Sequence, residues 1–222
     1  MDNYAKRAVK LIERLKPNWP KPVKYLGSGG SAITFNTNNG RVLKFSQGKN
    51  PIREVNALKH LQNANFVPRF RNGNYVMIKK SQNIENFLGI SGYMGKPVLR
   101  NGQSAIAFIQ GKVGGNKGMN LHTYLKKFPN GKQRVVNRIL PMLKYMQMKR
   151  ISHRNLQPAN IIVTVDSIGR ITGMWIIDFG NAEKIIGPKN NKNIKNLFMY
   201  LNLPYPNNAN ATVNSWAKKR VN

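Results

Sequence analysis

The chain contains no cysteine, few acidic residues and few histidines, and each scarcity excludes a class of protein. Without cysteine it has neither disulfides nor thiolate zinc sites. With three His and seven Asp+Glu, a dedicated metal cage of side chains is not expected. No apolar run approaches the roughly 20 residues that span a bilayer, and charges interrupt the apolar pattern of the N-terminus. We therefore expect a soluble, intracellular protein, or one delivered inside a particle assembled in a cell, such as a virion.

Basic residues are in large excess. There are 37 Lys+Arg against 7 Asp+Glu, which gives a net charge of +30, and the excess is spread along the whole chain. Such a surface repels itself and attracts polyanions. DNA or RNA would bind it in a strongly salt-dependent way. An anionic membrane surface or an acidic protein surface satisfies the same physics, and a basic protein that is merely soluble is the remaining alternative.

The composition is that of a globular chain, with 222 residues and 41% hydrophobic residues. Its apolar periodicity predicts a strand-rich first part and a helical second part. Helices are expected over residues 2–16, 51–61, 121–128 and 135–149. Strands are expected over residues 23–26, 33–35, 41–45, 66–70, 75–78, 105–109, 161–165 and 171–177.

These elements suggest four segments along the chain. They are an N-terminal amphipathic helix (1–19), a strand-rich part (20–112) with a loop insertion at 81–103, a helical part (113–186), and a basic segment rich in Asn, Lys and Pro (187–222). An Asn-Gly turn at Asn38-Asn39-Gly40 predicts a hairpin in the second segment.

Three features of the strand-rich part fit a phosphate site. The first is a glycine-rich run from Gly27 to Ala32, where the backbone can approach phosphate oxygens and donate N–H groups to them. The second is Lys44 on the strand that follows, and the third is Glu54 on the next helix. Taken singly, each also fits an ordinary turn or a solvated surface residue.

Two further segments stand in the helical part. One is Ile151-Ser152-His153-Arg154-Asn155-Leu156-Gln157-Pro158-Ala159-Asn160, and the other is Asp178-Phe179-Gly180, joined by the predicted hairpin over 161–177. The five segments in this order resemble the protein kinase superfamily, whose catalytic loop and magnesium-binding turn have this length and spacing. The resemblance covers about residues 20–185. It implies a bilobal α+β fold with ATP between a strand-rich lobe and a shortened helical lobe.

The resemblance also implies roles for individual residues. Gly27, Gly29 and Ala32, the last in place of a third glycine, would cover the phosphates of ATP. Lys44 would contact those phosphates and Glu54 would hold it. Asn160 and Asp178 would bind Mg²⁺. Two of the seven acidic residues, Glu54 and Asp178, thus stand where the family needs carboxylates. The remaining implied positions are the catalytic-loop residues His153 and Arg154, the gatekeeper Phe108 and the hinge residue Gln110.

The chain departs from the family pattern at the transfer step. Asn155 replaces the Asp that accepts the substrate's proton, and an amide can orient a hydroxyl but cannot take its proton. Gln157 replaces a Lys that contacts the γ-phosphate. No Ala-Pro-Glu segment follows Gly180, so we expect a shortened helical lobe. We therefore expect Mg-ATP binding with weak or no phosphotransfer.

Three functional hypotheses remain open. The first is a minimal active Ser/Thr-type protein kinase, because phosphoryl transfer depends mostly on positioning and electrostatics. The second is a catalytically inactive kinase-fold scaffold that binds nucleic acid or an acidic protein partner. Such a scaffold could be a component of a virion. The third is a protein whose affinity for a partner depends on bound ATP.

Overall fold

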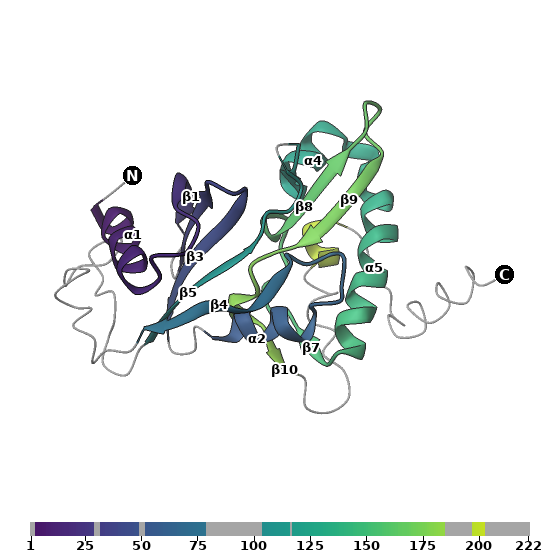
Figure 1. The fold of residues 1–222 in the computed structure, drawn as a ribbon. Helices are drawn as coiled ribbons and strands as arrows, with labels where there is room; N and C mark the ends of the chain where they lie inside the picture. Colours follow the sequence, from purple (N-terminus) through teal and green to yellow (C-terminus); the bar gives the residue numbers. More distant parts are fainter. Residues whose placement is uncertain are drawn as a thin grey trace. The chain divides into compact units, whose positions relative to one another are not determined.

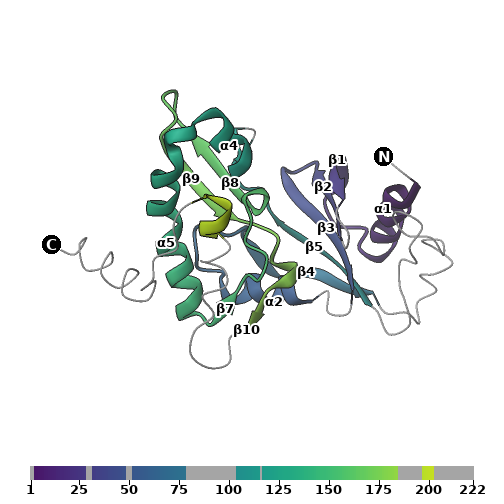
Figure 2. The ribbon, with the colours of Figure 1, turned by 180° about the vertical axis from the view of Figure 1, so that it is seen from behind.

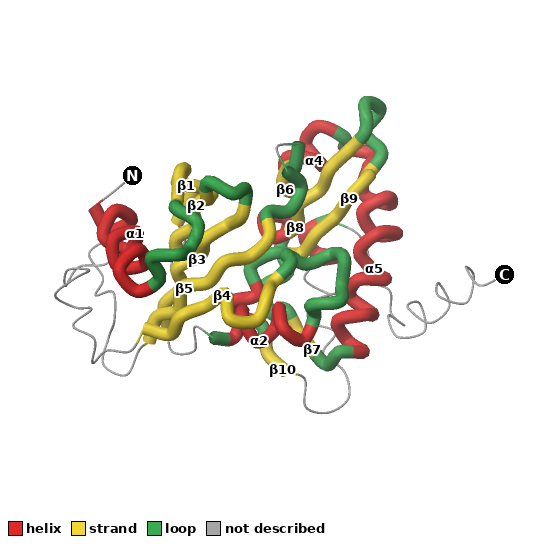
Figure 3. The backbone as a smooth tube through the Cα atoms, in the orientation of Figure 1, coloured by secondary structure: helices red, strands yellow, loops and turns green. Residues whose placement is uncertain are grey.

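The computed structural model describes residues 3–28, 32–48, 52–78, 104–115, 117–184 and 197–202 (Figures 1 and 3). The chain folds into two compact units. Unit 1 comprises Met1–Lys59 and Arg69–Lys112, and unit 2 comprises His60–Pro68 and Val113–Asn222. The predicted loop insertion at 81–103 lies outside the described residues, as does most of the segment 187–222.

Unit 1 is built on one antiparallel sheet with the strand order β1-β2-β3-β5-β4. The strands are β1 (Pro22–Ser28), β2 (Ala32–Thr37), β3 (Arg41–Gly48), β4 (Phe70–Ile78) and β5 (Ser104–Gly111). The predicted hairpin is confirmed, since β2 pairs with β3 and the Gly40 N–H donates to the Thr37 carbonyl (3.0 Å). Gly40 has a φ of 71°, which favours glycine and explains why this residue closes the turn.

The strand predicted over residues 66–70 is wrong. Phe66, Val67 and Pro68 belong to a turn and loop in unit 2, and β4 begins only at Phe70. All three are buried in succession, whereas a strand with one buried face alternates buried and exposed residues. Pro68 also has no N–H to donate to a strand ladder. β4 then continues to Ile78 with an irregular register between Phe70 and Tyr75.

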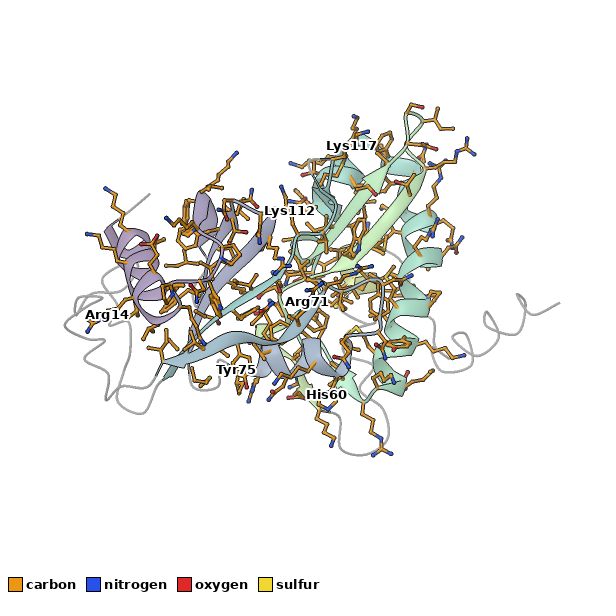
Figure 4. All side chains as sticks on the ribbon, in the orientation of Figure 1. Arg14, His60, Arg71, Tyr75, Lys112 and Lys117 are labelled. Carbon is orange, nitrogen blue, oxygen red and sulfur yellow. The ribbon has the colours of Figure 1, made fainter. Side chains whose placement is uncertain are left out.

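Helix α1 (Asn3–Leu15) covers one face of this sheet (Figure 1). Its Ala8, Leu11 and Ile12 pack in one buried cluster with residues of β2, β3, β4 and β5, among them Leu43 and Phe45. Because side chains alternate along a strand, the residue between Leu43 and Phe45 points to the opposite face of the sheet. That residue is Lys44. The opposite polar face of α1 carries exposed cations such as Arg14, labelled in Figure 4.

Helix α2 (Arg53–His60) follows β3 in the chain. Val55, Ala57 and Leu58 are buried, and so is Glu54 in its first turn. An acidic residue in the first turn interacts favourably with the helix dipole. The helix predicted over residues 51–61 is therefore confirmed. The observed helix begins two residues later and ends one residue earlier than predicted.

The described part of unit 2 combines helices with two small antiparallel sheets. The helices are α4 (Leu121–Lys127), α5 (Lys132–Met148) and a helical turn at residues 197–200. One sheet has the order β6-β8-β9, with β6 (Met119–Asn120), β8 (Ile161–Val165) and β9 (Ile171–Ile176), and the other pairs β7 (Ile151–Ser152) with β10 (Glu183–Lys184). Both predicted helices and the predicted hairpin of β8 and β9 are confirmed. Helix α5 runs alongside β9, as the opposite views of Figures 1 and 2 agree.

Short 3-10 turns join these elements at η3 (Pro129–Gly131), η4 (Pro158–Asn160) and η5 (Phe179–Asn181). Asn120 caps α4, because its Oδ1 accepts a hydrogen bond from the Thr123 N–H (2.8 Å). Among the residues that the structure describes, no helix has the length and apolarity needed to cross a membrane.

Candidate active site

The described residues of the glycine-rich run lie at the end of β1 and the start of β2. Gly27 has a φ of 147°, a conformation that side-chain-bearing residues rarely adopt. Its carbonyl accepts a hydrogen bond from the Thr34 hydroxyl (3.1 Å), which ties the end of β1 to β2. Ala32 begins β2, whereas Gly29 lies outside the described residues. A hydrogen bond between β1 and β2 therefore fixes the end of β1. The sequence did not predict this hydrogen bond.

Lys44 and Glu54 form a buried ion pair within unit 1. The Lys44 Nζ lies 2.6 Å from the Glu54 Oε2, and the two side chains are 6% and 1% exposed. β3 directs Lys44 to the face opposite α1, and the first turn of α2 brings Glu54 to it. Two charges taken out of water need each other, because a buried charge without a partner costs several kcal/mol. The pairing predicted from the sequence is therefore present.

β5 lies next to β3 and carries two of the predicted site residues. In the register of this pair, Phe108 stands opposite Lys44 and Gln110 opposite Val42. Phe108 is 0% exposed and Gln110 is 8% exposed. Phe108 also meets Phe70 of β4 in an edge-to-face contact, with ring centroids 6.3 Å apart. An aromatic side chain therefore lines the sheet directly beside the ion pair.

In unit 2, His153 fixes the segment after β7 to the segment after β9. Its ring is fully buried, and Nε2 lies 2.8 Å from the carbonyl of Ile177 in a hydrogen bond. The ring also packs against Phe179, with centroids 4.7 Å apart. A buried imidazole needs hydrogen bonds to offset its lost solvation, and the Ile177 carbonyl is such a partner. His153 is thus a positioning residue for the Asp178 turn.

The two predicted metal ligands are linked through the backbone. The Ile177 N–H donates to the Asn160 carbonyl (2.9 Å), so Asn160 is bonded to the residue just before Asp178. The Asn160 Nδ2 donates to the Asn155 carbonyl (2.9 Å). Since a carbonyl can only accept, the amide end faces Asn155 and the Oδ1 end is left to offer lone pairs.

This donor set fits magnesium better than a transition metal. No cluster of three or more His, Cys, Asp or Glu that could hold a metal occurs in the described part of the chain. Mg²⁺ usually binds to one or two carboxylates together with waters and substrate phosphates, and does not need a protein cage. The carboxylate of Asp178 and the amide oxygen of Asn160 match that preference.

Asn155 and Gln157, the two positions at which the sequence predicts a loss of catalytic groups, are both partly exposed. Asn155 follows Arg154, and its backbone carbonyl is held by Asn160 as described above. Gln157 has extended backbone angles just before η4. Neither side chain is sealed in the core, so both can meet solvent or a ligand.

Arg154 has a partner that sequence inspection missed. Its Nη1 lies 3.2 Å from the Glu183 Oε1, and the two side chains are 37% and 41% exposed. β10 carries Glu183 and pairs with β7, with Glu183 opposite Ser152. The scarcity of acidic residues was the signal in the sequence that could have pointed to Glu183. In a chain with only 7 Asp+Glu, an acidic residue close to a motif is a candidate partner for a basic residue of that motif.

Comparisons with known proteins bear on the fold. No protein-family model matches the sequence. A 60-residue stretch is 35% identical to the mitochondrial serine/threonine-protein kinase ppk24 of Schizosaccharomyces pombe, and it spans 27% of this chain and 12% of that protein. The solved structure of the kinase-like enzyme WaaP in complex with acyl carrier protein matches 99% of this chain and 88% of that chain, with a TM-score of 0.58 and 14% identity. At that identity the likeness concerns the fold.

Proposed function

The chain has a protein-kinase-like fold with that superfamily's motifs in order, and from this premise we propose that it binds ATP with Mg²⁺ and transfers phosphate weakly or not at all. The strongest support is the buried ion pair of Lys44 and Glu54, 2.6 Å apart. A buried pair of this kind often gains nothing in stability over a pair of apolar residues. A role in fixing an ammonium group for phosphate oxygens explains its presence better.

Asn160 and Asp178 would hold the magnesium ion, one through its amide oxygen and the other through its carboxylate. Bound there with ATP, the ion would neutralise phosphate charge. The chain's own contribution is to fix both ligands. The hydrogen bonds from Ile177 to Asn160 and from Asn160 to Asn155 restrain the loop, and packing of His153 on Phe179 restrains the Asp178 turn.

Asn155 is the reason to expect weak transfer. Its side-chain oxygen can accept a hydrogen bond from a substrate hydroxyl and so orient it, but it cannot carry the proton away. A general base contributes typically about 10²–10⁴-fold to a rate. Gln157 offers neutral hydrogen bonds where a lysine would offer charge. Any residual activity would be of the Ser/Thr protein kinase type.

Thermal unfolding with and without Mg-ATP tests nucleotide binding. A ligand at about 100 times its Kd stabilises the folded state by about 2.7 kcal/mol, which raises Tm by several degrees. We expect this rise with Mg-ATP, and a much smaller one with ATP and a chelator. Lys44→Met and Asp178→Ala should lose most of it, each compared with its own Tm in the absence of ligand.

Lys10→Met is the matched control for Lys44→Met. Lys10 is an exposed residue of α1, so its replacement removes the same charge without touching the ion pair. This variant should keep the full rise in Tm. Absence of any rise in the unmodified protein at millimolar Mg-ATP, or an equal rise in Asp178→Ala, would overturn the proposal.

A second candidate function is binding of a polyanion, with nucleic acid favoured over an acidic protein. The net charge of +30 is its general support. Its specific support is α5, which has four Lys or Arg and no acidic residue among its 17 residues. Two of the acids in unit 2, Asp166 and Glu183, are already paired with arginines. Affinity for DNA should fall steeply as salt rises, and a salt-independent affinity would remove this candidate.

A further inference from the structure

Unit 2 has a pocket of about 490 Å³, a volume typical of ligand sites. Its walls come from α5, from β9 and from the turn at Asn65 and Phe66, all of which lie within unit 2. None of the candidate active-site residues lines it. The pocket therefore shares no residue with the set proposed to hold ATP and Mg²⁺.

The pocket is lined by aromatic rings from all three walls. Phe66, Tyr145 and Trp175 all contribute to the lining, Phe66 being buried and the other two partly exposed. Phe66 meets Tyr145 edge to face with centroids 5.7 Å apart, and the Lys149 Nζ lies 5.6 Å from the centroid of the Tyr145 ring. Gly173 makes room for Trp175, since a Cβ at position 173 would lie 2.3 Å from the Trp175 ring atom Cη2. Flat aromatic faces of this kind are the usual surfaces on which unpaired bases stack.

Amide and carbonyl groups lie among the rings. Asn65 and Asn137 both line the pocket, and each amide can donate and accept hydrogen bonds, as the edges of bases do. Pro141 stands inside α5 and has no N–H, so it cannot donate to the carbonyl of Asn137 four residues earlier. The Asn137 side chain is oriented by Gln133, whose Nε2 donates a hydrogen bond to the Asn137 Oδ1 (3.0 Å).

Arginines are fixed at the side of the pocket. Arg138 lines it and donates to the Ile171 carbonyl (3.2 Å), and Arg134, one turn earlier, donates to the Gly169 carbonyl (3.4 Å). Both side chains are exposed yet held by the backbone around β9. The pocket lining contains no carboxylate. Phosphates would therefore meet oriented guanidinium groups with no opposing charge.

We infer that this pocket binds single-stranded nucleic acid, taking an unpaired base between its aromatic walls while Arg134 and Arg138 contact the flanking phosphates. This inference rests on the second candidate function and assigns it a site. An acidic protein would match the charge but would make no use of a recessed aromatic pocket. A duplex keeps its bases stacked inside and offers the arginines phosphates alone.

Fluorescence anisotropy with a labelled oligothymidylate tests this inference. The comparison ligands are an abasic oligomer of equal length and a duplex. We expect the oligothymidylate to bind at least about tenfold more tightly than the abasic oligomer, because stacking contributes substantially for each base held. This comparison needs no variant, so it does not depend on any substitution being tolerated by the fold.

Variants then assign the site. Trp175→Ala should weaken oligothymidylate binding about tenfold to a hundredfold and leave abasic binding unchanged, and Trp175→Phe should restore most of the loss. Arg138→Gln should weaken both ligands and lower the slope of log K against log salt by about 0.7. Arg14→Gln, an exposed charge loss on α1 in unit 1, is the matched control and should leave the preference for bases intact (Figure 4).

The outcomes separate the two claims. If no oligomer binds, the polyanion function and the inference both fail. If the abasic oligomer or the duplex binds as tightly as the oligothymidylate, the polyanion function holds and the base-binding pocket is overturned. Retention of the full preference for bases in Trp175→Ala would overturn it as well.

Discussion

Arg154 and Asp178 both have left-handed backbone angles, with a φ of 64° at each. Residues other than glycine adopt this conformation at a cost of order 1–3 kcal/mol, and surrounding structure must hold them in it. For Arg154 that structure includes the ion pair with Glu183, and for Asp178 it includes the bonds of Ile177 to His153 and Asn160. Arg150 and Asn202 have similar angles, so two of the four such non-glycine residues in the described part of the chain fall in the motifs to which the proposed function assigns chemistry.

Asn155→Asp should raise phosphotransfer by about 10²-fold or more, because it restores a group that can accept the substrate's proton. The substitution leaves the local structure in place, since Asn160 bonds to the backbone carbonyl at position 155 and not to the side chain. Release of labelled phosphate from ATP, or its transfer to a generic protein substrate, measures the rate.

The control for this experiment is the double variant Asn155→Asp with Asp178→Ala. Its rate should fall to that of the unmodified protein or below it, because the proposed metal ligand is lost. An Asn155→Asp rate equal to that of the unmodified protein would mean that position 155 does not limit transfer.

The hairpin of β8 and β9 turns on Gly169, which has a φ of 77°. The Asp166 Oδ1 accepts hydrogen bonds from the N–H groups of Ile168 (3.1 Å) and Arg170 (2.8 Å) and shapes the turn. A Cβ at position 169 would lie 2.4 Å from the ring of Phe128. Both the backbone conformation and the close packing therefore require glycine here.

Gly169→Ala should lower the free energy of unfolding by about 2–4 kcal/mol, of which about 1 kcal/mol comes from the left-handed backbone and the rest from displacing the ring. Gly115→Ala is the matched control, because Gly115 has a φ of 54° and open space around its Cβ position. Urea unfolding of both variants separates the two contributions. Equal losses would show that contact with Phe128 is unimportant.

Local patterns predicted most of these elements, and long-range contacts explain the failures. The hairpin of β2 and β3 and the helices α4 and α5 follow from turn residues and from apolar periodicity within each segment. The strand expected over residues 66–70 failed because Phe66 to Pro68 are all buried by tertiary packing, which periodicity does not reveal. The candidate site shows the same division: Lys44 and Glu54 were predicted, whereas Glu183 reaches Arg154 only through the pairing of β10 with β7.

At the scale of the whole molecule, the charge of +30 is the dominant physical feature. Such an excess destabilises the compact state through repulsion between like charges. Among the ion pairs of the described residues, Arg170–Asp166 and Arg154–Glu183 are exposed enough for solvent to weaken them. Screening by salt should therefore relieve more repulsion than it removes attraction.

Raising NaCl from about 0.02 M to about 0.5 M should accordingly raise Tm, since the Debye length falls from about 20 Å to about 4 Å over this range. KCl should act in the same way, because screening depends on ionic strength and not on the cation. The buried pair of Lys44 and Glu54 is shielded from the salt, so Lys44→Met should show the same rise from a different starting Tm. A Tm that falls as salt rises would mean that attraction within exposed ion pairs outweighs repulsion between like charges. The charge excess would then not destabilise the fold, and a bound polyanion would have no repulsion to relieve.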